Sequence, residues 1–265
     1  ELDGVDPRWD ASDPNLLYAF AETRLVRVDV RTGQQATVHD FAADFPGQRL
    51  AAVWTRYEGS SSLEGSIWGL MAEDESWETV GFIVYDQRAD RVIATRDLSG
   101  VSGAADIDSV TISPLGTHFL ADFSDHYCER GTLGTDAHPC GLMVYDRNLR
   151  NGRGVLRIAG HADLALDAER REVLVFQDLD TDTISLLDLA TGIVTPLWPI
   201  DFSHTALGLH FSGRALRRPR WAVVSTYNGG RPVAHTWMDD QVFLVELKSG
   251  GRVARLAHTR SIYSE

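Results

Sequence analysis

The sequence contains the stretch Leu25-Val-Arg-Val-Asp29-Val-Arg-Thr-Gly33, a short β-rich run that ends in an acidic residue and continues into a Thr-Gly turn. Four later runs share this layout: Phe82-Ile-Val-Tyr-Asp86, Leu142-Met-Val-Tyr-Asp146, Ile184-Ser-Leu-Leu-Asp188-Leu-Ala-Thr-Gly192 and Val242-Phe-Leu-Val-Glu246-Leu-Lys-Ser-Gly250. Successive acidic positions are 57, 60, 42 and 58 residues apart. Repetition at such a period is typical of propellers and other repeat architectures.

Each copy lies among further short β-rich runs. One run follows each copy after a turn that contains Thr-Gly, Ala-Asp, Arg-Asn or Ser-Gly, which are residues that suit hairpins. Another run precedes each copy, and most copies have an earlier run as well. About four strands in a unit of ~40–60 residues is the period of a propeller blade, and no long helical periodicity competes with it. The sequence therefore predicts an all-β fold, a β-propeller of four-stranded antiparallel blades, rather than a β-sandwich with coincidental hairpins.

We expect residues 1–265 to form a single propeller domain with blades at about 6–41, 49–98, 106–159, 161–199 and 205–259. The acidic residues of the five copies should occupy equivalent places at the ends of third strands and serve structure rather than catalysis; they are Asp29, Asp86, Asp146, Asp188 and Glu246. Five blades can close a ring, but a fragment of a six- or seven-bladed ring fits the pattern equally well.

Composition restricts the class of partner. The formal net charge is −13, and such a surface repels phosphate backbones and anionic membranes, so we expect no nucleic-acid partner. No apolar run approaches the ~20 residues needed to cross a bilayer, so we expect no membrane span. One local basic patch stands out at Arg214, Arg217, Arg218 and Arg220. It is either a solvated loop or a clamp for an acidic ligand, and the sequence favours the solvated loop.

The chain has two cysteines, Cys128 and Cys140. Both fall within one inferred loop, which predicts a disulfide worth roughly 3 kcal/mol and an oxidising compartment. A zinc site is disfavoured because no close cysteine or His-x₃₋₅-His pair accompanies them. The sequence also begins at Glu1 without an initiator methionine, as a processed or trimmed product would. We therefore expect a soluble protein that is secreted or periplasmic.

The segment Ser109-Val-Thr-Ile-Ser-Pro-Leu-Gly116, with the Tyr-Asp and Asp-x-x-Thr-Gly turns, resembles the blades of bacterial secreted and periplasmic propellers of the TolB-like type. Over nearly all its length the chain is also similar to a group of uncharacterised secreted bacterial propellers, in which we expect a run like His161-Ala-Asp163. Members of that group have more than five blades. The resemblance implies a secreted propeller with further blade material beyond Glu265.

Function in propellers gathers on one face, where the loops between second and third strands open beside the connections between blades. The long loops of this kind span residues 124–140 and 228–241, and the connections span 99–108, 160–161 and 201–205. The polar residues in or beside them are Asp106, Asp108, His126, Tyr127, Arg130, His138, His161, Asp163, His204, Tyr227, Arg231 and His235. Five of the chain's nine histidines are in this set, which makes it the candidate site.

One interpretation is β-elimination on an acidic polysaccharide, as in the oligogalacturonate and ulvan lyases, to which the chain is distantly similar in fold and residue type. This chemistry needs a neutraliser for the uronate carboxylate, a base and an acid. We assign the carboxylate and base roles to His138 and His161, the acid/base role to Tyr227, and the charge-partner role to Arg231. Ligand binding is predicted for Arg130, His204 and Trp237.

A second interpretation is a metal site. Asp178, Asp180 and Asp182 alternate as in a calcium loop, but the glycine and distal glutamate of an EF-hand are missing, which favours an ordinary hairpin turn. His161 and Asp163 could supply two ligands if their side chains point the same way. Calcium and manganese suit these residue types, so a divalent metal cofactor stays open.

A third interpretation is a non-catalytic propeller that binds a glycan, a peptide or a protein. Trp237 lies in a long loop and could stack on a sugar, whereas Trp54, Trp68 and Trp221 lie in strands and are expected in the core. Nothing matches the motifs of serine hydrolases, kinases or dehydrogenases. The sequence leaves open whether the chain is an enzyme, and names only a polysaccharide lyase if it is.

Overall fold

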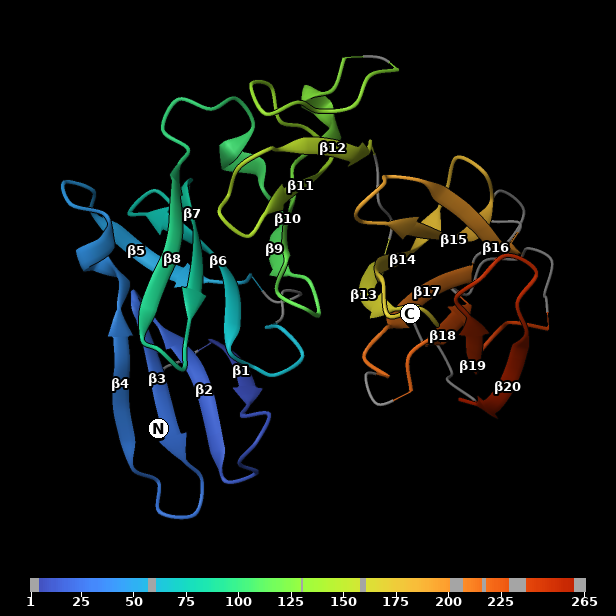
Figure 1. Cartoon of the computed structure of the whole chain (residues 1–265), viewed down its shortest axis with the longest axis horizontal. Helices are drawn as coiled ribbons and strands as arrows, with labels where there is room; N and C mark the ends of the chain where they lie inside the picture. The colour runs from blue at the N-terminus through green and yellow to red at the C-terminus, as the bar shows by residue number, and fades with distance from the viewer. Residues whose placement is uncertain are drawn as a thin grey trace. The chain divides into compact units, whose positions relative to one another are not determined.

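The computed structural model describes residues 5–56, 61–129, 131–157, 161–200, 207–215, 218–228 and 237–259. Within these ranges, twenty β-strands form five four-stranded antiparallel sheets (Figure 1). In each sheet the strands lie side by side in the order in which the chain makes them. This is the predicted blade topology, and the all-β fold class is confirmed. The helices of the described ranges are 3-10 turns of three or four residues, and none could cross a membrane.

The chain divides into two compact units, residues Glu1–Ile158 and Ala159–Glu265. Unit 1 holds three blades. The strands of blade 1 are β1 (Val5–Trp9), β2 (Leu16–Ala21), β3 (Arg24–Asp29) and β4 (Gln35–Asp40); those of blade 2 are β5 (Leu50–Trp54), β6 (Ile67–Asp74), β7 (Thr79–Asp86) and β8 (Arg91–Asp97); those of blade 3 are β9 (Ser109–Ile112), β10 (His118–Asp122), β11 (Leu142–Asp146) and β12 (Arg153–Leu156). The 3-10 turns η1 (Phe41–Asp44), η2 (Ala104–Asp106) and η3 (Asp125–Tyr127) lie between strands.

Unit 2 holds the other two blades. Blade 4 contains β13 (Ala162–Leu166), β14 (Glu172–Asp178), β15 (Thr183–Asp188) and β16 (Val194–Pro199). Blade 5 contains β17 (Leu207–Ser212), β18 (Trp221–Asn228), β19 (Gln241–Glu246) and β20 (Val253–His258). One apolar cluster joins the two blades, because Val173 and Leu186 of blade 4 pack in the same core as Val224 and Phe243 of blade 5.

The repeated acidic residue ends the third strand of every blade, as predicted. Its carboxylate accepts hydrogen bonds from backbone N–H groups of the following turn: those of Arg31 and Thr32 at Asp29, Ala89 at Asp86, Asn148 and Arg150 at Asp146, Ala190 and Thr191 at Asp188, and Arg252 at Glu246. Short acidic side chains close turns in this way because the carboxylate satisfies N–H groups that the sheet leaves unpaired. The repeated acidic residue therefore stabilises the turn between the third and fourth strands of each blade.

The interior of unit 1 is rich in aromatic rings. Phe82 of β7 packs against Phe119 of β10 and Tyr145 of β11, with ring centroids 4.8 and 6.0 Å apart. The predicted core residues Trp54 and Trp68 are buried, whereas Trp221 is only half-buried. These rings bury apolar surface between blade 2 and blade 3, and this packing holds the two sheets face to face.

The predicted disulfide is present between Cys128 and Cys140, with an S–S distance of 2.04 Å. It closes the long loop of blade 3. Tyr127, beside the disulfide, donates its hydroxyl hydrogen bond to Asp106 Oδ2 at 2.5 Å. The loop is therefore tied both to itself and to the connection that enters blade 3.

Candidate functional site

Two of the predicted catalytic residues, His161 and Tyr227, lie on either side of a third ring in unit 2. His161 directly precedes β13, and its ring centroid lies 4.4 Å from that of His210 in β17. His210 in turn stacks on Tyr227 of β18, at 5.9 Å and an interplanar angle of 25°. We call His161, His210 and Tyr227 the three-ring cluster. His210 is absent from the residues predicted from the loop pattern, because it lies within a strand.

The pairing of β17 with β18 explains the stack. His210 lies opposite Ser225, and Gly208 lies opposite Tyr227, so His210 and Tyr227 are diagonal neighbours on one face of the sheet. The phenol covers Gly208, where a Cβ atom would come within 2.1 Å of Tyr227 Cζ. Glycine at this position therefore makes room for the phenol. His161 and His210 are exposed and Tyr227 is half-buried, so the cluster faces solvent.

Asp163 holds His161 near blade 5. Its Oδ1 accepts from the backbone N–H of Leu164 at 2.7 Å, and its Oδ2 accepts from that of Gly213, just after β17, at 2.8 Å. The His161 carbonyl also accepts from the N–H of Gln177 in β14. Each oxygen of Asp163 thus accepts a backbone hydrogen bond, and the bond to Gly213 ties the start of β13 to blade 5.

The second metal candidate is an ordinary turn. Asp178 Oδ1 accepts from the N–H groups of Asp180 and Thr181, and Oδ2 accepts from Ser185 Oγ. Across the described ranges, no three His, Cys, Asp or Glu side chains gather where they could hold a metal ion.

The other predicted site residues are distributed over the chain. His138 lies in unit 1, where its backbone N–H bonds to Thr135 inside the disulfide loop. Arg130, His204 and Arg231 lie outside the described residues, as do Arg217 and His235. Their predicted roles stay predictions.

Trp237 belongs to a different surface from the three-ring cluster. It is 45% exposed, its ring meets Trp198 of β16 edge-on at 6.4 Å, and Arg255 of β20 lies over it at 5.9 Å. Arg255 Nη2 also donates to the Trp237 carbonyl at 3.0 Å. β16 and β20 are the fourth strands of their blades, whereas His210 is in the first strand of blade 5. The aromatic surface therefore lies at the opposite edge of the sheets.

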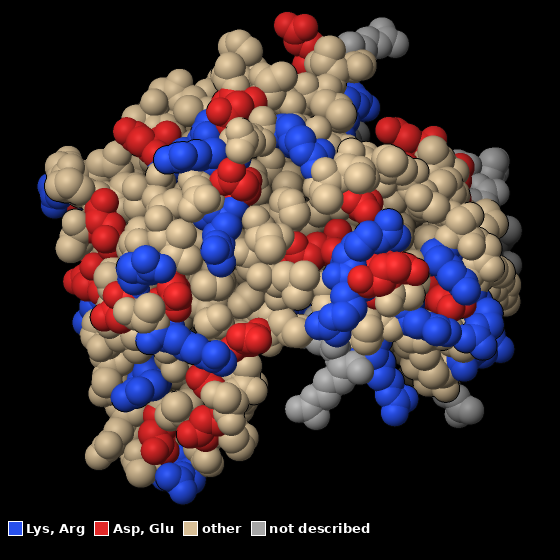
Figure 2. Space-filling model, viewed as in Figure 1, with Lys and Arg blue, Asp and Glu red and all other residues tan. Residues whose placement is uncertain are grey.

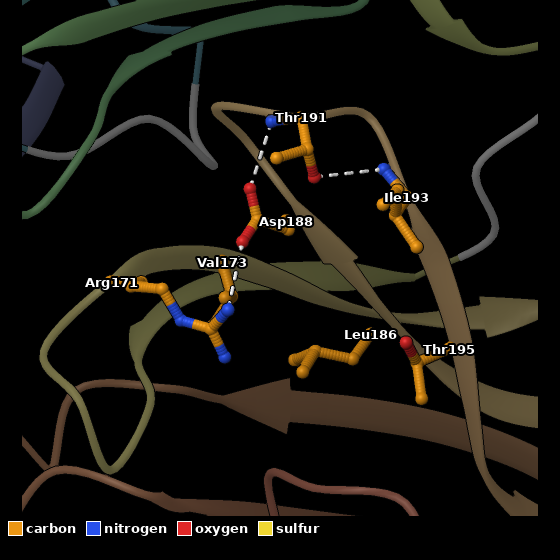
Figure 3. Close-up of a pocket in the computed structure, with 7 residues that line it drawn as sticks. All are labelled: Arg171, Val173, Leu186, Asp188, Thr191, Ile193 and Thr195. Carbon is orange, nitrogen blue, oxygen red and sulfur yellow. Dashed lines mark hydrogen bonds and ion pairs between the residues drawn. The ribbon is translucent and has the colours of Figure 1, made fainter.

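A small hollow of about 140 Å³ lies on blade 4, and Figure 3 shows its lining of Arg171, Val173, Leu186, Asp188, Thr191, Ile193 and Thr195. Arg171 is its one cation. The guanidinium group lies 2.6 Å from Asp167, 3.5 Å from Asp188 and 3.6 Å from Glu169. Three carboxylates already surround this single positive charge, so the hollow does not suit the carboxylate of a uronate.

Comparison with known proteins identifies the fold. No protein-family model and no curated protein sequence matches the chain. Among solved structures, an oligogalacturonate lyase from Vibrio parahaemolyticus matches 97% of this chain with a TM-score of 0.57 and 11% identity. An oligogalacturonate lyase in complex with manganese matches 92% of it with a TM-score of 0.50 and 12% identity. The chain has a β-propeller fold.

TolB from Acinetobacter baumannii is also similar, at a TM-score of 0.43 and 15% identity over 94% of this chain. The chain spans 55% of the length of the TolB chain, 66% of that of the Vibrio lyase and 77% of that of the manganese-bound lyase. Identities this low establish a shared fold and nothing further, because one fold hosts many activities.

Proposed function

We propose that this propeller is a carbohydrate-active protein that cleaves a uronic-acid-containing polysaccharide by β-elimination at the three-ring cluster. The observation that carries the proposal is the convergence of two imidazoles and a phenol, from two blades, on one exposed surface. The fold, which is that of the solved oligogalacturonate lyases, supports it by analogy.

The elimination has three requirements. A base takes the proton from C5 of the uronate, the electron pair forms the C4=C5 double bond, and the C4–O4 bond breaks as the leaving oxygen receives a proton. An imidazole nitrogen without a proton can accept the C5 proton, and a phenol can protonate the leaving oxygen. We assign the base to His161, with His210 beside it, and the acid to Tyr227. His138 keeps its predicted share of the carboxylate role, and Arg231 keeps its predicted role as charge partner.

The test is a panel of uronic-acid polysaccharides followed by the ultraviolet absorbance of the unsaturated product. His161→Ala, His210→Ala and Tyr227→Phe should each lower turnover by about 100-fold or more, the usual contribution of a general acid or base. His258→Ala is the matched control, because His258 is exposed at the end of β20, the edge strand of blade 5 opposite the strand of His210. Full activity of the His161→Ala variant would remove His161 from the mechanism.

The aromatic surface around Trp237 favours a second candidate, a propeller that binds a glycan without cleaving it. Half-exposed tryptophan with an arginine over its ring offers a stacking surface and a hydrogen-bond donor to a sugar. The test is retention of the protein on a polysaccharide affinity gel. Retention without turnover of the polysaccharide, together with loss of retention in Trp237→Ala, would support binding and exclude the lyase. Peptide or protein partners would give neither result.

We further propose that the protein is secreted or periplasmic. The disulfide between Cys128 and Cys140 supports this, because such bonds form and persist in oxidising compartments. Alkylation of the protein isolated from its native cells, before and after reduction, tests it. Two free thiols in the untreated protein would contradict the proposal.

A further inference from the structure

Blade 5 differs in charge from the rest of this acidic chain. Residues 205–259 contain eight Lys and Arg against three Asp and Glu, whereas the remaining residues contain 17 against 35. Figure 2 shows basic side chains gathered on the surface in the region of β19 and β20. Blade 5 is therefore the part of the chain in which positive charge exceeds negative charge.

Three of these basic residues converge on one carboxylate. Arg220 Nη2 and Lys248 Nζ lie 3.1 and 3.2 Å from Glu246 Oε1, and Arg252 Nε lies 3.4 Å from Glu246 Oε2. The Glu246 side chain is 3% exposed, but those of Arg220, Lys248 and Arg252 are 43, 60 and 71% exposed. The carboxylate of Glu246 is therefore buried beneath the three cationic side chains, which are exposed to solvent.

The cations outnumber the negative charge that holds them. The backbone N–H of Arg252, with the side chains of Lys248 and Arg252, lowers the pKa of Glu246 to about 2, so this residue is ionised at neutral pH. One negative charge opposes three positive ones. Among the residues that the structure describes, the cluster keeps two unbalanced positive charges.

The two guanidinium groups are also held in place. Arg220 lies 5.5 Å and Arg252 lies 5.4 Å from the centroid of the Trp221 ring. Packing of guanidinium faces against a ring leaves the N–H edges available as donors. Arg220 also has a φ of +85°, in the left-handed region that costs energy for a residue with a side chain. Its backbone is fixed by bonds to Leu166 and Leu247.

Glu246 cannot satisfy all these donors. Two guanidinium groups and one ammonium group carry more N–H donors than one carboxylate accepts. Arg220 Nε is buried without a hydrogen-bond partner in the described part of the chain. We propose that Arg220, Lys248 and Arg252 form a binding site for a single sulfate or phosphate group, held open by Glu246 and Trp221. Arginine forks match the oxygens of such groups with paired hydrogen bonds.

A single anionic group fits better than a polymer with many charges. The rest of the chain carries twice as many acidic as basic residues and repels an extended polyanion such as DNA. Three cations around one point, rather than along a track, match one compact oxyanion. The group could belong to a free anion or to an ester on a sugar.

The test is a calorimetric titration with inorganic sulfate, with sodium chloride exchanged for sulfate so that the ionic strength stays constant. Wild-type protein should bind sulfate saturably, and Arg252→Gln should weaken binding at least tenfold. Arg91→Gln is the matched control, because it removes the same charge from an exposed arginine at the start of β8 in unit 1 and should change Kd less than twofold. No saturable binding, or equal losses in both variants, overturns the site.

Two further arms identify the source of the anion. Tighter binding of galactose 6-sulfate than of inorganic sulfate assigns the site to a sugar ester, and equal or weaker binding assigns it to a free anion. Double-stranded DNA that binds through Arg252 more tightly than either anion would overturn the single-group site. His210→Ala should bind sulfate like wild type, so this result is independent of whether the proposed lyase activity exists.

Discussion

His39 links blade 1 to blade 2 through a contact that should make unit 1 less stable as pH rises. Its Nδ1 lies 2.7 Å from Asp90 Oδ1, in the turn after β7, and its Nε2 lies 2.8 Å from Asp44 Oδ2 in η1. Tyr85 of β7 donates to the same Asp90 oxygen at 2.8 Å. Two carboxylates face both ring nitrogens, and only the imidazolium can donate to both.

The sign follows from the pKa. Partial burial alone lowers the pKa of His39, but hydrogen bonds to Asp44 and then Asp90 outweigh it, so the pKa lies above its ordinary value. A raised histidine pKa contributes stability that is complete below the unfolded pKa of about 6.5 and is lost as pH rises through the folded pKa. Asp90, whose pKa is lowered chiefly by Tyr85 and then His39, loses its own contribution only in acid.

The magnitude follows from two charge-assisted hydrogen bonds. Each is worth about 1.5–3 kcal/mol when shielded, and the bond to Asp90 is worth less because that side chain is 56% exposed. We expect His39→Gln to lower the free energy of unfolding by about 2 kcal/mol more at pH 5.5 than at pH 9. Loss of ring packing against Phe41 and Tyr85, at 4.6 and 5.0 Å, should add a penalty that is independent of pH.

The assay is urea unfolding of wild type, His39→Gln and His126→Gln from about pH 5.5 to 9, followed by circular dichroism. His126 has an 89% exposed side chain and lies 3.9 Å from Asp125 in a surface contact of little energetic value, so its substitution should change the free energy of unfolding by less than about 0.5 kcal/mol. A penalty for His39→Gln that is constant with pH, or that grows as pH rises, would refute the reasoning.

Three further predictions follow from single contacts. Gly208→Ala would place a methyl group 2.1 Å from Tyr227 Cζ; thermal melts should show a loss of about 1–3 kcal/mol, and unchanged stability would mean that the phenol does not need the glycine. Replacement of Cys128 and Cys140 by serine should cost roughly 3 kcal/mol in urea unfolding, and no loss would show that the loop is held without the bond. Trp54→Phe would leave the buried Glu73 carboxylate without the indole donor at 2.9 Å and should cost about 1–3 kcal/mol, whereas the same change at Trp77, which is 60% exposed, should cost little.

The sequence by itself determined the features that depend on neighbours along the chain. Asp29 and Asp188, each the first residue of an Asp-x-x-Thr-Gly run, both bond to the N–H groups two and three residues later, so the same few letters produce the same turn in two different blades. The disulfide pairs the chain's two cysteines across a loop of 12 positions. Local hydrogen bonds and short loops leave their pattern in the order of residues, which is why the blade register could be predicted.

The tertiary structure decided what the candidate sites contain. His210 joins His161 and Tyr227 only through the register of β17 on β18 and the docking of β13, and a histidine within a strand gives no sign of which neighbours its outward face will meet. The basic run at 214–220 was visible in the sequence, but the convergence of Arg220 with Lys248 and Arg252 on Glu246 was not. In these two sites, side chains as far apart in sequence as His161 and His210 meet because sheets pair and pack, and packing depends on three-dimensional shape that no local pattern records.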